Sequence, residues 1–97
     1  MLNLQVRKET GEVIARGTGR LDWVDLQSID AEKFPFLGSL LPYADTMFNS
    51  RQTERLRKEI ADRSVTEILE HDLLTEIERL CRQVENGSHL YLWFVGD

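Results

Sequence analysis

Alternating apolar and polar positions at both ends of the chain predict β-strands. Residues 2–8 alternate strictly, which is the pattern of a strand with one buried face. A short hairpin loop follows, in which Gly11 is expected to take a left-handed backbone conformation. The loop leads to a second strand over 12–16, which Gly17-Thr18-Gly19 is expected to end. Residues 89–95 are apolar on both faces, as in strands that lie centrally in a sheet.

A helical period of apolar residues appears in the second half of the chain. It predicts a helix over about 50–62, with Asn49 or Ser50 as its N-cap. A longer helix is expected over about 65–85, because Ser64-Val65-Thr66-Glu67 has the spacing of a capping box and the apolar residues that follow recur every 3.6 positions. The sequence therefore predicts two helices in succession before the last strand.

The element order β-β-α-α-β predicts an α+β fold in a single domain over residues 1–97. The sheet is expected to be small and antiparallel with strand order 2-1-3, because the last strand fits beside the first, and it has room for a fourth short strand. Two helices can cover only one face of this sheet. The irregular segment 20–48, or a partner, must then cover the other. The last strand would present Leu90, Leu92 and Phe94 on one face and Tyr91, Trp93 and Val95 on the other.

Composition excludes several classes of protein. A chain of 97 residues with one cysteine forms no internal disulfide and no zinc site of several thiolates. His71, Cys81 and His89 are too few to complete a metal site, so neither a metal nor a cofactor is expected. No apolar stretch approaches the ~20 residues that span a bilayer, and the first residues are charged where a signal peptide is apolar. We therefore expect a cytoplasmic protein that does not enter a membrane.

The formal charge of −5 is unevenly distributed. Residues 1–20 and 49–63 each carry a net charge of +2, whereas residues 21–48 carry −4 and residues 64–97 carry −5. The acidic total disfavours a nucleic-acid ligand, which would need a basic surface. Because opposite charges steer protein encounter, a partner is expected to be basic and to contact residues 21–48 or the second helix.

Acidic and aromatic side chains are the candidates for binding such a partner. Tyrosine and tryptophan are enriched at the energetic centres of interfaces. The alternative is that the acids are solvated loop and helix positions and that the aromatic residues fill the second face of the sheet. The predicted partner-binding residues are Asp22, Asp25, Asp30, Tyr43, Asp45, Tyr91 and Trp93.

Two segments of the chain resemble a group of small uncharacterised bacterial proteins of about this length. Pro42-Tyr43-Ala44-Asp45-Thr46-Met47-Phe48-Asn49 matches their P-Y-x-D-T-x-F-N segment, and Leu92-Trp93-Phe94-Val95-Gly96-Asp97 matches their final L-W-F-x-G-D strand. The resemblance covers roughly residues 35–97 and implies a bacterial source and a stand-alone domain, but no reaction. If the first segment marks a site, its side chains form a polar cluster; the structural alternative is capping of the first helix. That polar cluster would consist of Tyr43, Asp45, Thr46, Asn49, Gln52 and Asp97.

No catalytic residue is expected, because the chain contains neither a glycine-rich phosphate loop nor a nucleophile elbow. The favoured hypothesis is a non-enzymatic protein-binding domain, an immunity-type or regulatory partner of a basic protein. The hypothesis rests on the missing catalytic motifs, the uneven charge and the last strand that is apolar on both faces. In size and acidity the chain also resembles immunity proteins that neutralise secreted toxins. A homodimeric domain that associates through the Tyr91 face or a sheet edge is one alternative. A small enzyme, with the carboxylates of Asp45 and Asp97 in a pocket beside Tyr43, is the other.

Overall fold

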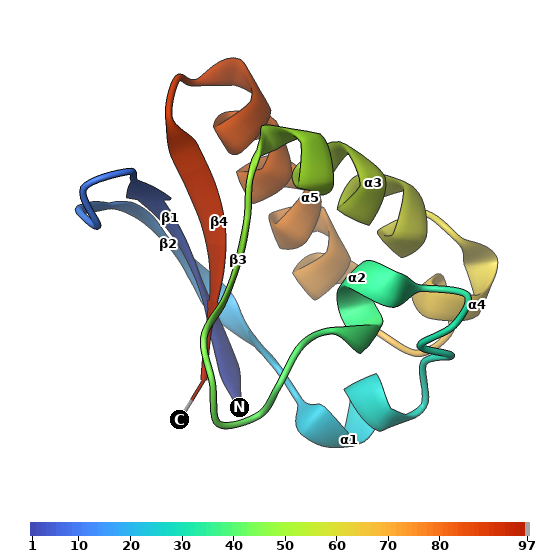
Figure 1. Cartoon of the computed structure of the whole chain (residues 1–97). Coiled ribbons are helices and arrows are strands. Elements are labelled where there is room, and N and C mark those ends of the chain that lie inside the picture. The colour runs from blue at the N-terminus through green and yellow to red at the C-terminus, as the bar shows by residue number, and fades with distance from the viewer. Residues whose placement is uncertain (97) are drawn as a thin grey trace.

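A computed structural model describes residues 1–96, in which five helical segments lie on one side of a four-stranded antiparallel sheet (Figure 1). The expected α+β class and antiparallel sheet are confirmed, whereas the number of helices and the details of the sheet differ. The elements are β1 (Leu2–Lys8), β2 (Val13–Leu21), α1 (Trp23–Gln27), α2 (Pro35–Gly38), β3 (Thr46–Phe48), α3 (Ser50–Ile60), α4 (Arg63–Thr66), α5 (His71–Asn86) and β4 (Leu90–Val95).

The strands follow one another across the sheet in the order β2-β1-β4-β3. The last strand lies beside the first, as expected, and Gln5 of β1 pairs directly with Trp93 of β4. The fourth strand, β3, pairs with the other side of β4 through Met47 and Trp93. Gly11 joins β1 to β2 with a φ of 96°, in the left-handed region where glycine is favoured, so the predicted hairpin is confirmed.

The second strand runs to Leu21, so the prediction that it ends at residues 17–19 was wrong. Its register against β1 shifts there, and these residues leave the regular ladder. The N–H groups of Thr18 and Gly19 donate instead to the carboxylate of Glu76 on α5, each at 2.9 Å. A Cβ at Gly17 would lie 2.5 Å from a carboxylate oxygen of Glu76, so glycine leaves the space that this side chain occupies.

The helix predicted over 65–85 is two separate helices, and the capping box predicted at Ser64 is absent. Asp62 caps α4 instead, because its side chain accepts a hydrogen bond from the N–H of Ser64 at 2.9 Å. The chain is then extended at Glu70, with ψ at 144°, and α5 begins at His71. Val65 of α4 is nevertheless fully buried, so it contributes to the apolar period without belonging to the same helix.

Apart from its ends, where Arg20 and Leu21 belong to β2 and Thr46–Phe48 is β3, the segment 20–48 packs on the helix side of the sheet. The carboxylate of Glu59 on α3 accepts hydrogen bonds from the N–H groups of Phe36 and Leu37 at 3.0 and 2.9 Å, which ties α2 to the helical layer. This segment therefore does not cover the second face of the sheet, which was one of the two expected possibilities. Its side chains buried in the core are Leu21, Leu26, Ile29, Phe34, Leu37, Leu40 and Phe48.

Candidate functional site

The face of the sheet opposite the helices is uncovered by residues 1–96 (Figure 1). The cross-strand pairs fix which side chains point to it, because residues directly opposite each other share a face. Gln5, for example, pairs with Arg16 on one side and with Trp93 on the other. We call this surface the open sheet face. By these pairs it consists of Asn3, Gln5, Arg7, Val13, Arg16, Arg20, Met47, Tyr91, Trp93 and Val95, and the exposed Ile14 is included because it lies two residues before Arg16 on the same strand.

The open sheet face is basic although the chain is acidic. The four strands contain four basic residues and no aspartate or glutamate, whereas the chain as a whole contains 17 acidic residues. The three arginines at 7, 16 and 20 all point to the open side. They are not among the site residues predicted from the sequence, because Glu9 and Glu12 in the hairpin loop offset their charge when the N-terminal segment is summed. The signal that distinguishes them is their place at the polar positions of two strands that contain no acid.

Arg7 and Trp93 form the centre of this face. The guanidinium of Arg7 lies 4.3 Å from the centre of the Trp93 ring, within the range of a cation–π contact. Arg7 Nε also donates a hydrogen bond to Oε1 of Gln5 at 2.8 Å, which fixes the orientation of the guanidinium. Tyr91 and Trp93 are both partly exposed, as expected of an aromatic face without a covering layer.

Arg16 and Arg20 project from the edge strand β2. Both are exposed, and neither is paired with a carboxylate of residues 1–96. Their positive charges are therefore available to a ligand. Ile14 on the same strand and Met47 on the opposite edge strand are 39% and 51% exposed, so apolar surface accompanies the charge.

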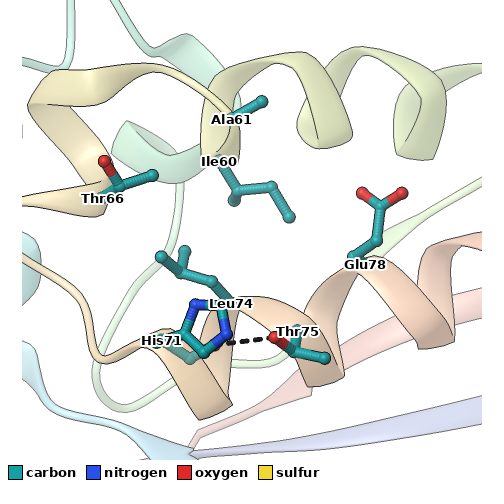
Figure 2. Close-up of a pocket in the computed structure, with 7 residues that line it drawn as sticks. All are labelled: Ile60, Ala61, Thr66, His71, Leu74, Thr75 and Glu78. Atoms are coloured by element: carbon teal, nitrogen blue, oxygen red, sulfur yellow. Dashed lines mark hydrogen bonds between the residues drawn. The ribbon is translucent and has the colours of Figure 1, made fainter.

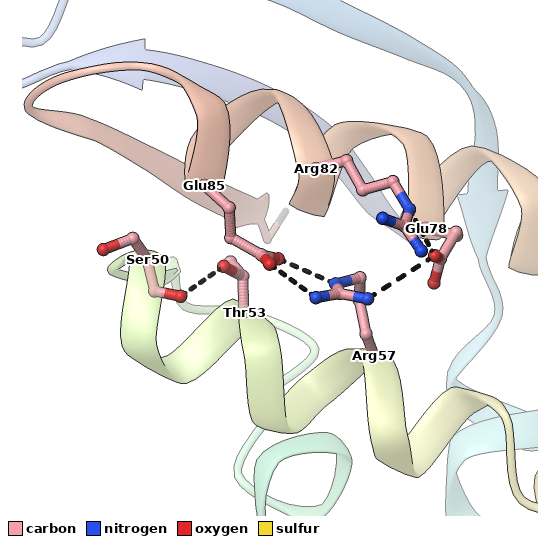
Figure 3. A network of polar contacts seen from close by, with 6 residues as sticks. All are labelled: Ser50, Thr53, Arg57, Glu78, Arg82 and Glu85. Atoms are coloured by element: carbon pink, nitrogen blue, oxygen red, sulfur yellow. Dashed lines mark hydrogen bonds and ion pairs between the residues drawn. The ribbon is translucent and has the colours of Figure 1, made fainter.

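Arg57, on the helix side, shows the contrasting arrangement (Figure 3). It joins α3 to α5 by donating two hydrogen bonds to Glu85, from Nε at 2.8 Å and from Nη2 at 2.6 Å. Glu78 lies 3.7 Å from Nη1 and also accepts a hydrogen bond from Arg82 at 2.7 Å. The hydrogen bonds raise the pKa of Arg57 and lower that of Glu85. The charged groups of this network are paired with one another, and the network links the two long helices.

Three of the predicted partner-binding acids bind backbone N–H groups. Asp22 is the N-cap of α1 and accepts from Val24 at 3.0 Å, while Asp30 accepts from Glu32 at 3.0 Å. The third, Asp45, accepts from the N–H of Gly96 at 3.0 Å. These carboxylates therefore stabilise turns and element ends, whatever else they contact.

The structure separates the predicted partner-binding residues into groups. Tyr91 and Trp93 lie on the open sheet face, whereas Asp22 and Asp45 lie at the end of the sheet where β2 and β4 finish. Asp25 lies in the first turn of α1, beside Asp22, and Asp30 lies further along the irregular segment. Tyr43 precedes β3 and is 83% exposed.

The two segments that carry the family resemblance lie side by side. Strand β3 belongs to the first segment and pairs with β4 of the second. Gly96 approaches the loop before β3 so closely that a Cβ there would lie 2.6 Å from the backbone of Ala44. Together with the hydrogen bond from Gly96 to Asp45, this contact gives both segments a structural role.

Two of the six residues of the predicted polar cluster form a helix cap. Asn49 and Gln52 exchange hydrogen bonds between side chain and backbone, each at 2.9 Å, in a capping box at the start of α3. Thr46 lies on β3 and pairs with Phe94. Asp97 lies outside the described residues, so the pocket imagined between Asp45 and Asp97 stays a prediction.

A hollow of about 240 Å³ lies between α3, α4 and α5 (Figure 2). Ile60 and Leu74 form its floor, and His71 and Glu78 lie on its rim. The hydroxyl of Thr75 donates to the carbonyl of His71 at 3.0 Å and is thereby used within α5. The surface that lines the hollow is mainly apolar, although four of its seven side chains are polar: Thr66, His71, Thr75 and Glu78.

Comparisons with protein-family models, with curated proteins and with solved structures found no match to this chain. Within residues 1–96 no three His, Cys, Asp or Glu side chains are grouped as metal ligands, and no helix has the length and apolar character to cross a membrane. The single cysteine, Cys81, is fully buried, and burial raises the pKa of its thiol to about 12.

Proposed function

We propose that this chain is a non-enzymatic protein-binding domain and that its partner docks on the open sheet face. The observation that carries the proposal is that the helices cover only one of the two faces of the sheet. All five helical segments of residues 1–96 pack on one face of the sheet, and the other face presents the partly exposed Arg7, Tyr91 and Trp93 and the exposed Arg16 and Arg20. Aromatic and arginine side chains are the residues most enriched at the energetic centres of protein interfaces.

The size of the face indicates how much of the molecule a partner would contact. Four strands about 4.8 Å apart, with a rise of about 3.3 Å per residue, give a face of roughly 400 Å². A standard interface buries about 800 Å² on each protein. A stable partner would therefore extend beyond the strands, and the adjoining end of the sheet, with Asp22 and Asp45, is a surface it could reach.

The acidic residues support a more specific proposal, in which the chain is an immunity-type or regulatory partner of a basic protein. Asp22, Asp25 and Asp45 lie at one end of the sheet, where their charge would attract a basic region of the partner. The same carboxylates that bind backbone N–H groups keep their net charge, so a structural role and an electrostatic role are compatible.

The homodimer alternative is opposed by charge at this face. In a two-fold dimer the same patch of both copies meets itself. Arg7, Arg16 and Arg20 of each copy would then enter one interface without a carboxylate from the strands to pair with, which costs binding energy. Light scattering on the purified chain at micromolar concentration decides this point: a monomer is expected, and a dimer would favour the alternative.

Capture of partners by variant chains tests the proposal. Met47→Asp, on the open sheet face, is compared with Leu41→Asp, because the two native side chains are 51% and 53% exposed. Both immobilised chains are incubated with extract of the source cells, and bound proteins are identified by mass spectrometry. We expect at least one protein to bind the native chain and the Leu41 variant but not the Met47 variant. If no bound protein depends on Met47, the open sheet face is not the docking surface.

A further inference from the structure

We propose that the open sheet face binds an acidic segment of the partner protein, with carboxylates of that segment paired to Arg16 and Arg20. This inference rests on the proposed function and names the chemistry of the partner at this surface. It reverses, for the sheet, the basic partner expected from the net charge of the chain. The reason is that the net charge is a sum over surfaces of opposite sign, whereas a partner contacts only one of them.

The charge on the face is unbalanced. Arg16 and Arg20 are exposed, carry no carboxylate partner in residues 1–96, and lie on a sheet whose strands contain no acid. On the helix side Arg57 is paired with Glu85, Arg63 with Glu67 and Arg82 with Glu78, whereas Arg51, Arg55 and Arg79 have no ion pair within residues 1–96. What distinguishes Arg16 and Arg20 is that the strands around them contain no acid at all. Carboxylates of a docked segment would supply the acidic partners, with the bidentate geometry that guanidinium groups favour.

Arg16 and Arg20 lie on β2 with the exposed Ile14, whereas the aromatic residues and Met47 of the face lie on β4 and β3. The strand order places Arg16 on one edge strand and Met47 on the other, three strand spacings or about 14 Å apart, with Trp93 between them. A segment that crosses the strands would place its carboxylates over β2 and its apolar side chains over β4 and β3. We therefore infer a partner segment that is both acidic and apolar, rather than a uniformly charged one.

A nucleic acid fits this face less well. Base stacking requires a free aromatic surface, but the guanidinium of Arg7 already lies 4.3 Å from the centre of the Trp93 ring. A polyanion that extended past the sheet would also meet the acids of the helical side and of the irregular segment, which give the whole chain its net charge of −5. A short acidic peptide segment avoids that repulsion because its charge is local.

The test is a titration of the isotope-labelled full chain followed by nuclear magnetic resonance. The probes are a synthetic peptide of alternating glutamate and leucine, a matched peptide with lysine in place of glutamate, and a short oligothymidine. The indole N–H signal of Trp93 reports on the open sheet face, and that of Trp23 on α1 is the internal control. We expect the acidic peptide to shift the Trp93 signal and to bind more weakly as salt is added.

Charge-reversal variants test whether Arg16 and Arg20 are the arginines that bind the acidic peptide. Arg16→Glu combined with Arg20→Glu is expected to weaken binding of the acidic peptide at least about tenfold, the equivalent of two charge pairs lost and replaced by repulsion. Arg51→Glu combined with Arg55→Glu changes the total charge equally on α3 and is expected to have little effect. The neutral pair Arg16→Gln and Arg20→Gln, expected to weaken binding by a smaller factor, tests the same point with less risk to folding.

Each other outcome overturns the inference. The inference is wrong if the acidic peptide does not shift the Trp93 signal, or if the lysine peptide or oligothymidine binds more tightly than the acidic peptide. It is also wrong if both charge reversals weaken binding equally. None of these results bears on whether a protein docks at the face, which the capture experiment with the Met47 variant measures separately. If instead that capture fails while the acidic peptide binds, the chemistry of the face stands and the proposed function falls.

Discussion

Replacing Glu76 by glutamine removes the negative charge and one acceptor oxygen from the contact between α5 and β2. The native carboxylate accepts three hydrogen bonds: from the N–H groups of Thr18 and Gly19, both at 2.9 Å, and from the hydroxyl of Thr18 at 2.8 Å. Because residues 17–19 have left the regular ladder with β1, these N–H groups depend on the carboxylate or on water.

The magnitude follows from the number of bonds and from their exposure. A hydrogen bond to a charged group contributes about 1.5–3 kcal/mol when it is buried, and less when water competes for it. Glu76 and Gly19 are partly buried, whereas Thr18 is exposed. We therefore expect Glu76→Gln to lower the free energy of unfolding by about 1–2 kcal/mol and Glu76→Ala by about 2–3 kcal/mol. For a chain of this size, 1 kcal/mol corresponds to a decrease in Tm of about 4–8 °C.

The loss should also depend on pH. Burial by itself raises the pKa of Glu76, but the hydrogen bonds from Thr18 and Gly19 lower it below the ordinary value of 4.5. The stabilisation is therefore complete above the unfolded-state pKa, near 4.5, and is lost as the pH falls through the folded-state pKa. The native chain and Glu76→Gln should differ most near pH 7 and converge in acid.

Urea unfolding followed by circular dichroism between pH 7 and pH 3 measures this difference. Glu32→Gln is the matched control, because Glu32 is exposed and its side chain accepts no hydrogen bond within residues 1–96. That control should change the free energy of unfolding by less than about 0.5 kcal/mol. The reasoning is refuted if Glu76→Gln is as stable as the native chain at pH 7, or if its deficit is the same at pH 3.

Three further results are expected. Arg57→Ala leaves the partly buried Glu85 without its bidentate partner and should lower the free energy of unfolding in urea by about 2–3 kcal/mol. The control Arg63→Ala changes a side chain that is 91% exposed and should lower it by less than about 0.5 kcal/mol. Equal losses would contradict the role of Arg57 in joining α3 to α5. Burial raises the pKa of the Cys81 thiol to about 12, so the folded chain should resist iodoacetamide at pH 8 and the chain unfolded in urea should react. Rapid labelling of the folded chain would contradict this prediction, because it would show that the thiol is accessible. Gly96→Ala should lower the free energy of unfolding by about 2 kcal/mol, because its Cβ would lie 2.6 Å from facing backbone; an unchanged midpoint in urea would refute the close approach.

Regular local patterns accounted for much of the fold. The period of two in β1 and the apolar run of β4 predicted both strands and their pairing. Asn49 was identified as a candidate cap because a side-chain acceptor at that position binds the free N–H groups of a helix start. The strands and the cap depend on neighbouring residues, which a sequence displays directly, whereas the pairing was inferred because an apolar run on both faces is typical of a central strand.

The features that depended on distant residues were missed. The break between α4 and α5 does not disturb the apolar period of the sequence. Val65 is buried in the core although it belongs to α4, just as it would be in one continuous helix. The continuation of β2 past Gly17 depends on Glu76, which is 59 positions away along the chain. The basic character of the open sheet face became visible only when the helices were placed on one side, since average charge along a segment mixes both faces of a strand with its loop.

Photo-crosslinking in the source cells tests the docking surface most directly. A photoreactive phenylalanine analogue replaces Met47 on the open sheet face or, as the control, Arg55 on the exposed side of α3. We predict a covalent adduct with one protein from position 47, its absence from position 55, and its loss when Arg16 and Arg20 are both changed to glutamate. An adduct that forms only from position 55, or one from position 47 that survives reversal of both arginines, would contradict the account.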